Sequence, residues 1–235
     1  MIDLVGFDGD DTLWRSQEFY DQAQEAFEEI LGRYVDLGAD GLRQALLDTE
    51  RGNIALFGYG AKGMALSMIE SAIELTDGRI EARDVHRIVR LGKDVLAHPV
   101  DLLPGIREAV EAVATTHRVV LITKGDLFHQ EAKVAGSGLA DVFHRIEIVS
   151  EKDPAAYARL FREFGVAADR FAMVGNSLKS DIVPVLRLGG WGVYMPYHST
   201  WAHERIDDFS MTDRVVEVAG AAGIPAAIAA MHASP

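Results

Sequence analysis

Apolar residues follow two different periodic patterns along the chain. From about residue 19, they recur at three- and four-residue steps with acidic and other polar residues between them, which is the pattern of amphipathic helices. This pattern predicts four helices, over residues 19–34, 41–50, 63–75 and 81–96. From Leu103-Pro104-Gly105 onward, short apolar runs alternate with helical patterns, which predicts strands joined by crossover helices.

The alternating region predicts a parallel sheet. The expected strands cover residues 118–123, 146–150, 171–175, 192–195 and 214–218. The apolar run 2–8 predicts one more strand, which must join the same sheet because a lone strand ahead of a helical block has no partner. The expected fold class is therefore α/β, a Rossmann-like three-layer parallel sheet core of residues 1–14 and 101–235, with an all-helical cap domain inserted at 15–100.

Composition and charge limit the function classes. The 235 residues are 49% hydrophobic, which is ample for a packed core. A net charge of −13 argues against nucleic-acid binding, which calls for clustered Lys and Arg. Cysteine is absent, so disulfides, thiolate metal sites and cysteine nucleophiles are excluded. The sequence shows neither a signal peptide nor a membrane span, so we expect a cytoplasmic protein with no membrane partner.

Three carboxylates follow the first predicted strand, in Phe7-Asp8-Gly9-Asp10-Asp11-Thr12-Leu13. In parallel sheets, ligands collect beyond the carboxyl ends of the strands, so we expect Asp8 and Asp10 to face a site. Closely spaced carboxylates repel one another unless a cation offsets their charge, and Mg²⁺ is the usual oxygen-liganded ion. Asp11 and Thr12 can equally be turn or helix-start residues.

Three later strand ends carry further candidate residues. Thr123 and Lys124 end one strand, where the hydroxyl and the following helix start can hold a phosphate oxygen. Lys152 follows the next strand, ahead of a proline suited to a first helical turn. Asn176 follows a third strand, and Asp181 lies about one helical turn beyond it, close enough to complete a cation site.

Together, these motifs resemble those of the haloacid dehalogenase-like (HAD) hydrolase superfamily with a helical C1-type cap. The first motif is D-x-D-x-T-L at Asp8 to Leu13, and the other three follow in order at predicted strand ends. The resemblance implies a Mg²⁺-dependent phosphatase in which Asp8 attacks phosphorus and Asp10, protonated at first, is the general acid and base. It further implies that Thr123 orients the phosphoryl oxygens and that Lys152 stabilises charge.

In this resemblance, Mg²⁺ is bound by Asp8, the Asp10 carbonyl oxygen and Asp181. Asn176 stands where the family often has an acid, so which of Asn176 and Asp181 touches the ion stays open. Lys124 follows Thr123 where an Asn is common, and it can add positive charge near the substrate. An acid at Asp10 favours phosphoryl transfer, because family members that dehalogenate carry none there.

Several alternatives remain open on the sequence alone. A phosphomutase of the same superfamily would use the same motifs, and a haloacid dehalogenase or a non-catalytic binding protein on this fold are further alternatives. We expect the substrate to be a small phosphorylated metabolite, because a large cap encloses its ligand. Which metabolite it is cannot be read from the sequence. The apolar cap helices could pair two copies into a homodimer or pack internally.

Two other motifs admit competing interpretations. Gly58-Tyr59-Gly60-Ala61-Lys62-Gly63 matches the G-x-G-x-x-G dinucleotide fingerprint, but it lies between predicted helices, without the strand that this fingerprint requires. We interpret it as a cap loop in which Lys62 contacts substrate. A cluster of His198, Trp201, His203 and Glu204 could suggest a transition metal, but we prefer a loop that lines the crevice.

Overall fold

The computed structural model describes residues 1–206 and 208–231, and the chain forms two compact units. The first comprises Met1–Gln17, Val100–Lys124 and Gln130–Pro235, and the second comprises Glu18–Pro99 with Gly125–His129. The sequence had placed Gly125–His129 in the core domain. This segment groups with the helices because Asp126 contacts Gly60 and Lys62.

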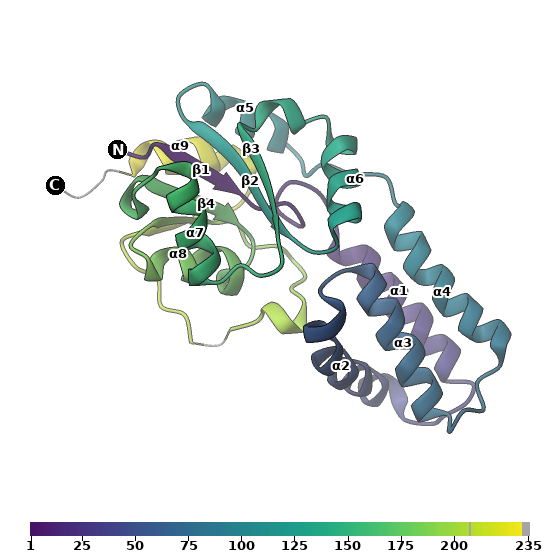
Figure 1. The fold of residues 1–235 in the computed structure, drawn as a ribbon. Helices are drawn as coiled ribbons and strands as arrows, with labels where there is room; N and C mark the ends of the chain where they lie inside the picture. Colours follow the sequence, from purple (N-terminus) through teal and green to yellow (C-terminus); the bar gives the residue numbers. More distant parts are fainter. Residues whose placement is uncertain (207, 232–235) are drawn as a thin grey trace. The chain divides into compact units, whose positions relative to one another are not determined.

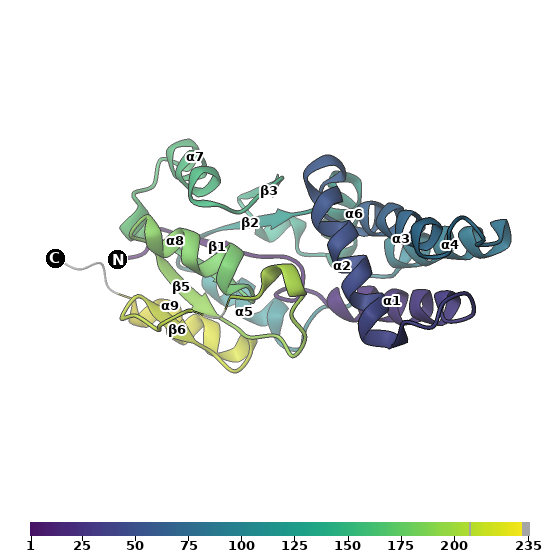
Figure 2. The ribbon, with the colours of Figure 1, turned by 90° about the horizontal axis from the view of Figure 1, so that it is seen from below.

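The first unit is built on a six-stranded parallel sheet in the order β3-β2-β1-β4-β5-β6; Figure 1 labels β1 to β4, and Figure 2 labels β5 and β6. All five strand pairs are parallel, and β1 lies between β2 and β4. The predicted α/β fold class is confirmed. The strands are β1 (Leu4–Phe7), β2 (Arg118–Lys124), β3 (Arg145–Val149), β4 (Phe171–Gly175), β5 (Trp191–Tyr194) and β6 (Val215–Glu217).

Helices cover both faces of this sheet, and successive strand residues point to opposite faces. Val5 and Phe7 of β1 belong to the core that includes α5 (Ile106–Ala114) and α9 (Ile224–Ala230). Leu4 belongs to a second core on the other face. That core includes residues of α7 (Pro154–Phe164) and α8 (Val183–Arg187), and the helices can be followed in Figure 2. All four residues of β1 are buried, which explains its continuous apolar run.

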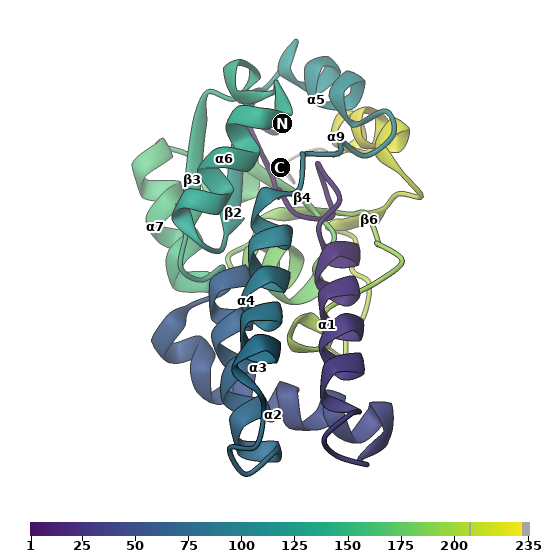
Figure 3. The same ribbon diagram turned by 90° about the vertical axis from the view of Figure 1, so that its right-hand side faces the viewer.

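The second unit contains the four helices expected of the inserted block (Figure 3). Their buried residues form one separate core. The second helix extends seven residues beyond its predicted end at residue 50. The prediction stopped too early because Leu56 and Phe57, near the C-terminus of the helix, are exposed and break the apolar periodicity. The helices are α1 (Gln17–Leu31), α2 (Gly38–Phe57), α3 (Ala61–Leu75) and α4 (Ala82–Ala97).

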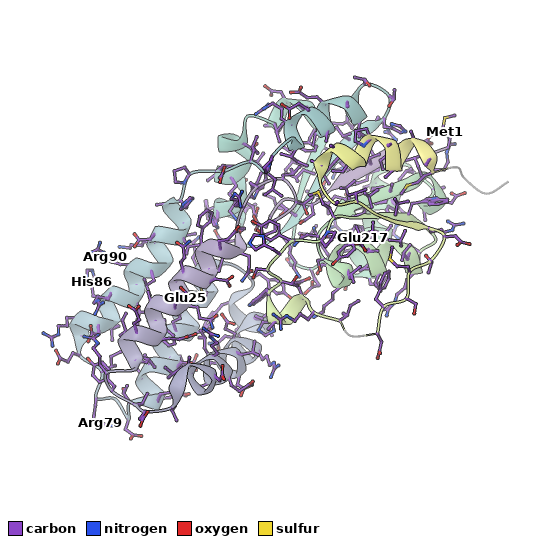
Figure 4. The ribbon with its side chains drawn as sticks, turned by 180° about the vertical axis from the view of Figure 1, so that it is seen from behind. Met1, Glu25, Arg79, His86, Arg90 and Glu217 are labelled. Carbon is purple, nitrogen blue, oxygen red and sulfur yellow. The ribbon has the colours of Figure 1, made fainter. Side chains whose placement is uncertain are left out.

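The polar faces of these helices are exposed to solvent. Figure 4 labels Glu25 on α1 and His86 and Arg90 on α4, and all three side chains are exposed. This agrees with the amphipathic pattern read from the sequence. Within residues 1–206 and 208–231, every helix is too short or too polar to cross a membrane.

Candidate active site

Asp8 stands at the carboxyl end of β1, in the middle of the sheet. Its backbone N–H donates to the Val174 carbonyl oxygen at 2.9 Å, which extends the pairing with β4 by one residue. Its side chain is buried, and the buried Thr12 hydroxyl donates to Asp8 Oδ2 at 3.1 Å. Thr12 therefore contacts the candidate nucleophile, a contact that the turn interpretation of this residue did not include.

Asp11 has the structural role that its turn interpretation gave it. Its backbone is left-handed, with φ of 60°. Its Oδ1 accepts hydrogen bonds from the backbone N–H groups of Ser16, at 2.8 Å, and Gln17, at 3.0 Å. These groups lie at the start of α1, where N–H groups lack partners within the helix. Asp11 thus shapes the turn and caps the helix.

A buried lysine joins two of the predicted site carboxylates. Lys152 follows β3, and its Nζ donates to Asp8 Oδ1 and, at 2.7 Å, to Asp181 Oδ1. Burial opposes the charge on Lys152, but Asp181 and Asp8 outweigh it and raise the lysine pKa above its usual range. Burial, followed by the Asp181 carboxylate, raises the pKa of Asp8 to about 7. The structure thus brings these three predicted residues together.

Asp181 reaches this site because Gly175 leaves room for it. Asp181 lies in η3 (Leu178–Ile182), a π-helical turn, and its Oδ2 accepts the Ser177 backbone N–H at 3.0 Å. A Cβ on Gly175 would stand only 2.2 Å from Asp181 Oδ2. Both oxygens of Asp181 are therefore already engaged, one by Lys152 and one by Ser177.

Asn176 completes a convergence of oxygen atoms beside Asp8. One terminal atom of its amide lies 3.2 Å from Asp8 Oδ2, from the Asp10 carbonyl oxygen and from Thr12 Oγ1. If this atom is the amide oxygen, it faces only acceptor atoms. If the amide is rotated, its N–H group donates to Asp8 Oδ2, to the Asp10 carbonyl oxygen and to Thr12 Oγ1. Oxygens that converge in this way suit a hard cation such as Mg²⁺. Of the two candidate ligands, Asn176 faces these oxygens, whereas both carboxylate oxygens of Asp181 already accept hydrogen bonds.

The charges around Asp8 also call for a cation. These ion pairs join five carboxylates to three ammonium groups. A divalent ion would offset the excess of carboxylates. The carboxylates are those of Asp8, Asp10, Glu151, Asp181 and Glu204, and the ammonium groups are those of Lys124, Lys133 and Lys152.

Asp10 is held by three donors that the sequence did not single out. Its Oδ1 accepts from Lys133 Nζ at 2.7 Å and from Trp14 Nε1 at 2.6 Å, and its Oδ2 accepts from Gln130 Nε2 at 2.8 Å. Burial opposes the charge, but Lys133, Gln130 and Trp14 outweigh it and lower the pKa of Asp10. These donors favour the carboxylate form of Asp10, whereas the resemblance implied a group that is protonated at first.

Thr123 is buried at the end of β2, as the sequence predicted for a strand-end hydroxyl. Its Oγ1 lies 3.4 Å from Gln130 Oε1, so Gln130 connects Thr123 with Asp10. A Cβ on Gly9 would stand 3.0 Å from Thr123 Oγ1 and 2.9 Å from the Trp14 ring. Gly9 thus allows the strand ends of β1 and β2 to approach closely.

Lys124 contacts acidic and hydroxyl groups in the first unit. Its Nζ lies 2.5 Å from Glu204 Oε1, 3.0 Å from Ser180 Oγ and 3.3 Å from Glu151 Oε1. Glu204 belongs to η4 (Ala202–Glu204), after β5, so one residue of the predicted loop cluster reaches the site region. Within the described residues, no group of three or more His, Asp or Glu side chains is arranged to hold a metal ion.

Lys62 lies in the helical unit and pairs with Asp126. Its Nζ lies 2.9 Å from both Asp126 carboxylate oxygens and 5.0 Å from the centre of the Phe128 ring. The glycine-rich segment connects α2 to α3 with no strand before it, as expected for a loop between helices. Its predicted contact with substrate stays a prediction.

Comparisons with known proteins identify the same family as the sequence motifs. A family model described as haloacid dehalogenase-like hydrolase matches residues 2–188. The chain is 55% identical to a haloacid dehalogenase-like family hydrolase from Xanthomonas campestris, with a TM-score of 0.88, over 98% of this chain and 91% of that one. No curated protein matches the chain.

Two more distant structures share the fold. A predicted phosphoglycolate phosphatase from Haemophilus somnus 129pt is 17% identical, with a TM-score of 0.63, over 97% of this chain and 98% of that one. A 2-haloacid dehalogenase from Pseudomonas syringae pv. Tomato DC3000 is 22% identical, with a TM-score of 0.62, over 97% and 99%. On the family-model match and the 55% identity, the chain belongs to the haloacid dehalogenase-like hydrolase family.

Proposed function

We propose that this hydrolase is a Mg²⁺-dependent phosphatase that cleaves a small-molecule phosphate monoester through an aspartyl-phosphate on Asp8. The observation that carries the proposal is the Asp10 carboxylate, two residues beyond the nucleophile and held by three donors. Halide displacement needs no acid at that position. Phosphate ester hydrolysis does, because the leaving oxygen must take up a proton.

In the first step, an Asp8 carboxylate oxygen attacks phosphorus in line, and the bond from phosphorus to the leaving oxygen breaks. Lys152 holds Asp8 in place through its bond to Oδ1 and leaves Oδ2 on the side of Thr12 and Asn176. A phosphate dianion bound beside Asp10 raises the pKa of that carboxyl group. Asp10 then takes up a proton from solvent and donates it to the leaving oxygen.

In the second step, Asp10 is again a carboxylate and accepts a proton from the water that attacks phosphorus. This attack releases phosphate and restores Asp8. The Thr123 hydroxyl, at the end of β2, orients a phosphoryl oxygen. A Mg²⁺ ion held by Asp8, the Asp10 carbonyl oxygen and Asn176 would offset the repulsion between carboxylate and phosphate dianion.

The direct test is a phosphate-release screen over small phosphate monoesters, with Mg²⁺ and with a chelator, and with Asp8→Asn as the blank. The proposal expects release that needs both Mg²⁺ and Asp8. Quenched reactions analysed by mass spectrometry should carry a phosphoryl group on Asp8. Turnover that continues in the Asp8→Asn variant would refute the nucleophile assignment.

The same protein preparations distinguish the proposed phosphatase activity from the alternative functions of this fold. Incubation with 2-chloropropionate should release no chloride, whereas a dehalogenase would release it. Transfer of the phosphoryl group to a second hydroxyl, with no free phosphate, would indicate a phosphomutase instead. A protein inactive in all three assays would point to a binding role on this fold.

A further inference from the structure

Glu204 bridges two strand ends in the first unit. Its Oε1 lies 2.5 Å from Lys124 Nζ, and its Oε2 accepts the Ser177 hydroxyl at 2.5 Å and the Ser180 hydroxyl at 2.6 Å. The side chains of Lys124 and Glu204 are only 14% and 13% exposed. One ammonium and two hydroxyl groups thus converge on a single carboxylate, which is the donor set of an anion-binding site.

The position of this contact follows from the sheet order. Lys124 ends β2, whereas Ser177 and Ser180 follow β4, and these two strands flank β1. This contact therefore joins the ends of the two strands that flank β1, the strand at whose end Asp8 stands. The family model ends at residue 188, so Glu204 lies outside the part of the chain that this model describes.

The segment that carries Glu204 lies at the surface of the first unit. Its residues 196–206 are half-buried or exposed, and none is fully buried. Besides Glu204, the His203 carbonyl oxygen accepts a hydrogen bond from Lys179 Nζ at 2.5 Å. An incoming carboxylate would offer the same acceptor atoms as Glu204 to Lys124, Ser177 and Ser180.

We infer that Lys124, Ser177 and Ser180 form a cradle for a carboxylate on the substrate's leaving group, and that Glu204 fills this cradle until substrate displaces it. The inference rests on the proposed function and adds a substrate class to it, phosphate monoesters that bear a carboxylate. Glu204 then acts as a specificity residue, because a substrate without a second anionic group cannot take its place.

Binding to the inactive Asp8→Asn protein tests the cradle without turnover. Calorimetry with Mg²⁺ would compare phosphoglycolate with ethyl phosphate, which lacks the carboxylate. In this background, Glu204→Ala should tighten phosphoglycolate binding by about tenfold, or about 1.4 kcal/mol, because the internal competitor is gone. Ethyl phosphate binding should stay unchanged. Lys124→Met should abolish the preference for phosphoglycolate.

Glu151→Gln is the matched control, since Glu151 also contacts Lys124 but its side chain is 47% exposed. It removes a similar charge while Glu204 still fills the cradle, so the ratio of the two affinities should stay near that of the parent protein. Equal weakening of both ligands by Glu204→Ala, or selective weakening of phosphoglycolate, would overturn the inference. If the cradle behaves as expected but the active protein releases no phosphate from any monoester in the screen, the proposed function fails while the cradle stands.

Discussion

Removing the charge of Lys133 should both destabilise the fold and disturb Asp10. Lys133 lies on α6 (Leu127–Ser137) and is buried, and its Nζ lies 2.7 Å from Asp10 Oδ1 and 3.3 Å from Ser16 Oγ. Lys133→Met keeps the length and apolar stem of the side chain and deletes the ammonium group. Asp10 then keeps only the Trp14 and Gln130 donors.

The expected loss of folding stability in Lys133→Met lies between two limits. Exposed ion pairs contribute about 0–1 kcal/mol, and breaking a buried pair costs about 3–5 kcal/mol. The side chain of Lys133 is 10% exposed and that of Asp10 is 29% exposed, and two donors still satisfy the carboxylate. We therefore expect unfolding at neutral pH to become easier by about 2 kcal/mol, close to the value of one charge-assisted hydrogen bond.

This loss of folding stability should be largest at neutral pH and should shrink as pH falls. The lowered pKa of Asp10 contributes stability above the unfolded-state value of 3.8, and this contribution disappears as pH falls through the folded-state pKa. Urea unfolding of wild type and Lys133→Met should therefore differ most at neutral pH and converge in acid. Lys93→Met, at an exposed position on α4, is the control. Equal stability of Lys133→Met and wild type at neutral pH would refute the reasoning.

Three further changes have defined outcomes. Gly175→Ala places a Cβ 2.2 Å from Asp181 Oδ2 and should lower kcat by about a hundredfold through misplacement of that carboxylate. Trp14→Phe removes the indole donor to Asp10 and should destabilise the fold by about 1–2 kcal/mol in urea titrations. Hydrogen bonds from Tyr34, then Arg33, lower the pKa of Asp84 to about 2. Asp84→Asn should therefore lower the Tm at neutral pH, with a difference from wild type that shrinks from about pH 4 downward.

Two of these changes, Gly175→Ala and Asp84→Asn, have a matched control in the same chain. Gly52→Ala adds a methyl group where a Cβ would meet no atom within 4 Å, so its kcat should match wild type. Asp94→Asn changes an exposed acid on the same helix as Asp84 and should leave the Tm and its pH dependence unchanged. Full activity in Gly175→Ala, or a Tm difference for Asp84→Asn that persists in acid, would contradict the respective argument.

The sequence predicts the sheet well because its signals are local. The runs around β1 and β4 are continuous stretches of buried apolar residues, and turn residues bound them. Strand-end positions then follow from chain order, which is why Asp8, Lys152 and Asp181 were expected together. The end of α2 was missed because periodicity reports burial, and an exposed helix end carries none.

The surroundings of Asp10 could not be predicted because they depend on side chains brought together only by folding. Gln130 and Lys133 are three residues apart on α6, and a polar helix face reads as solvated unless its neighbours are known. Lys133 is nevertheless buried and lies 123 residues from Asp10 in sequence. Glu204 reaches Lys124 across 80 residues, from a segment with no apolar periodicity.

The energetic cost of the Asp10 cluster also supports phosphoryl transfer over halide displacement. Taking an ion pair such as Lys133 and Asp10 largely out of water costs free energy, and apolar replacements of similar volume are often as stable or more so. Stability alone therefore does not explain why a carboxylate is held here by three donors. The phosphoryl transfer proposed above would use this cluster, because the same donors would fix the position of Asp10 for both proton transfers. Displacement of a halide needs no such proton.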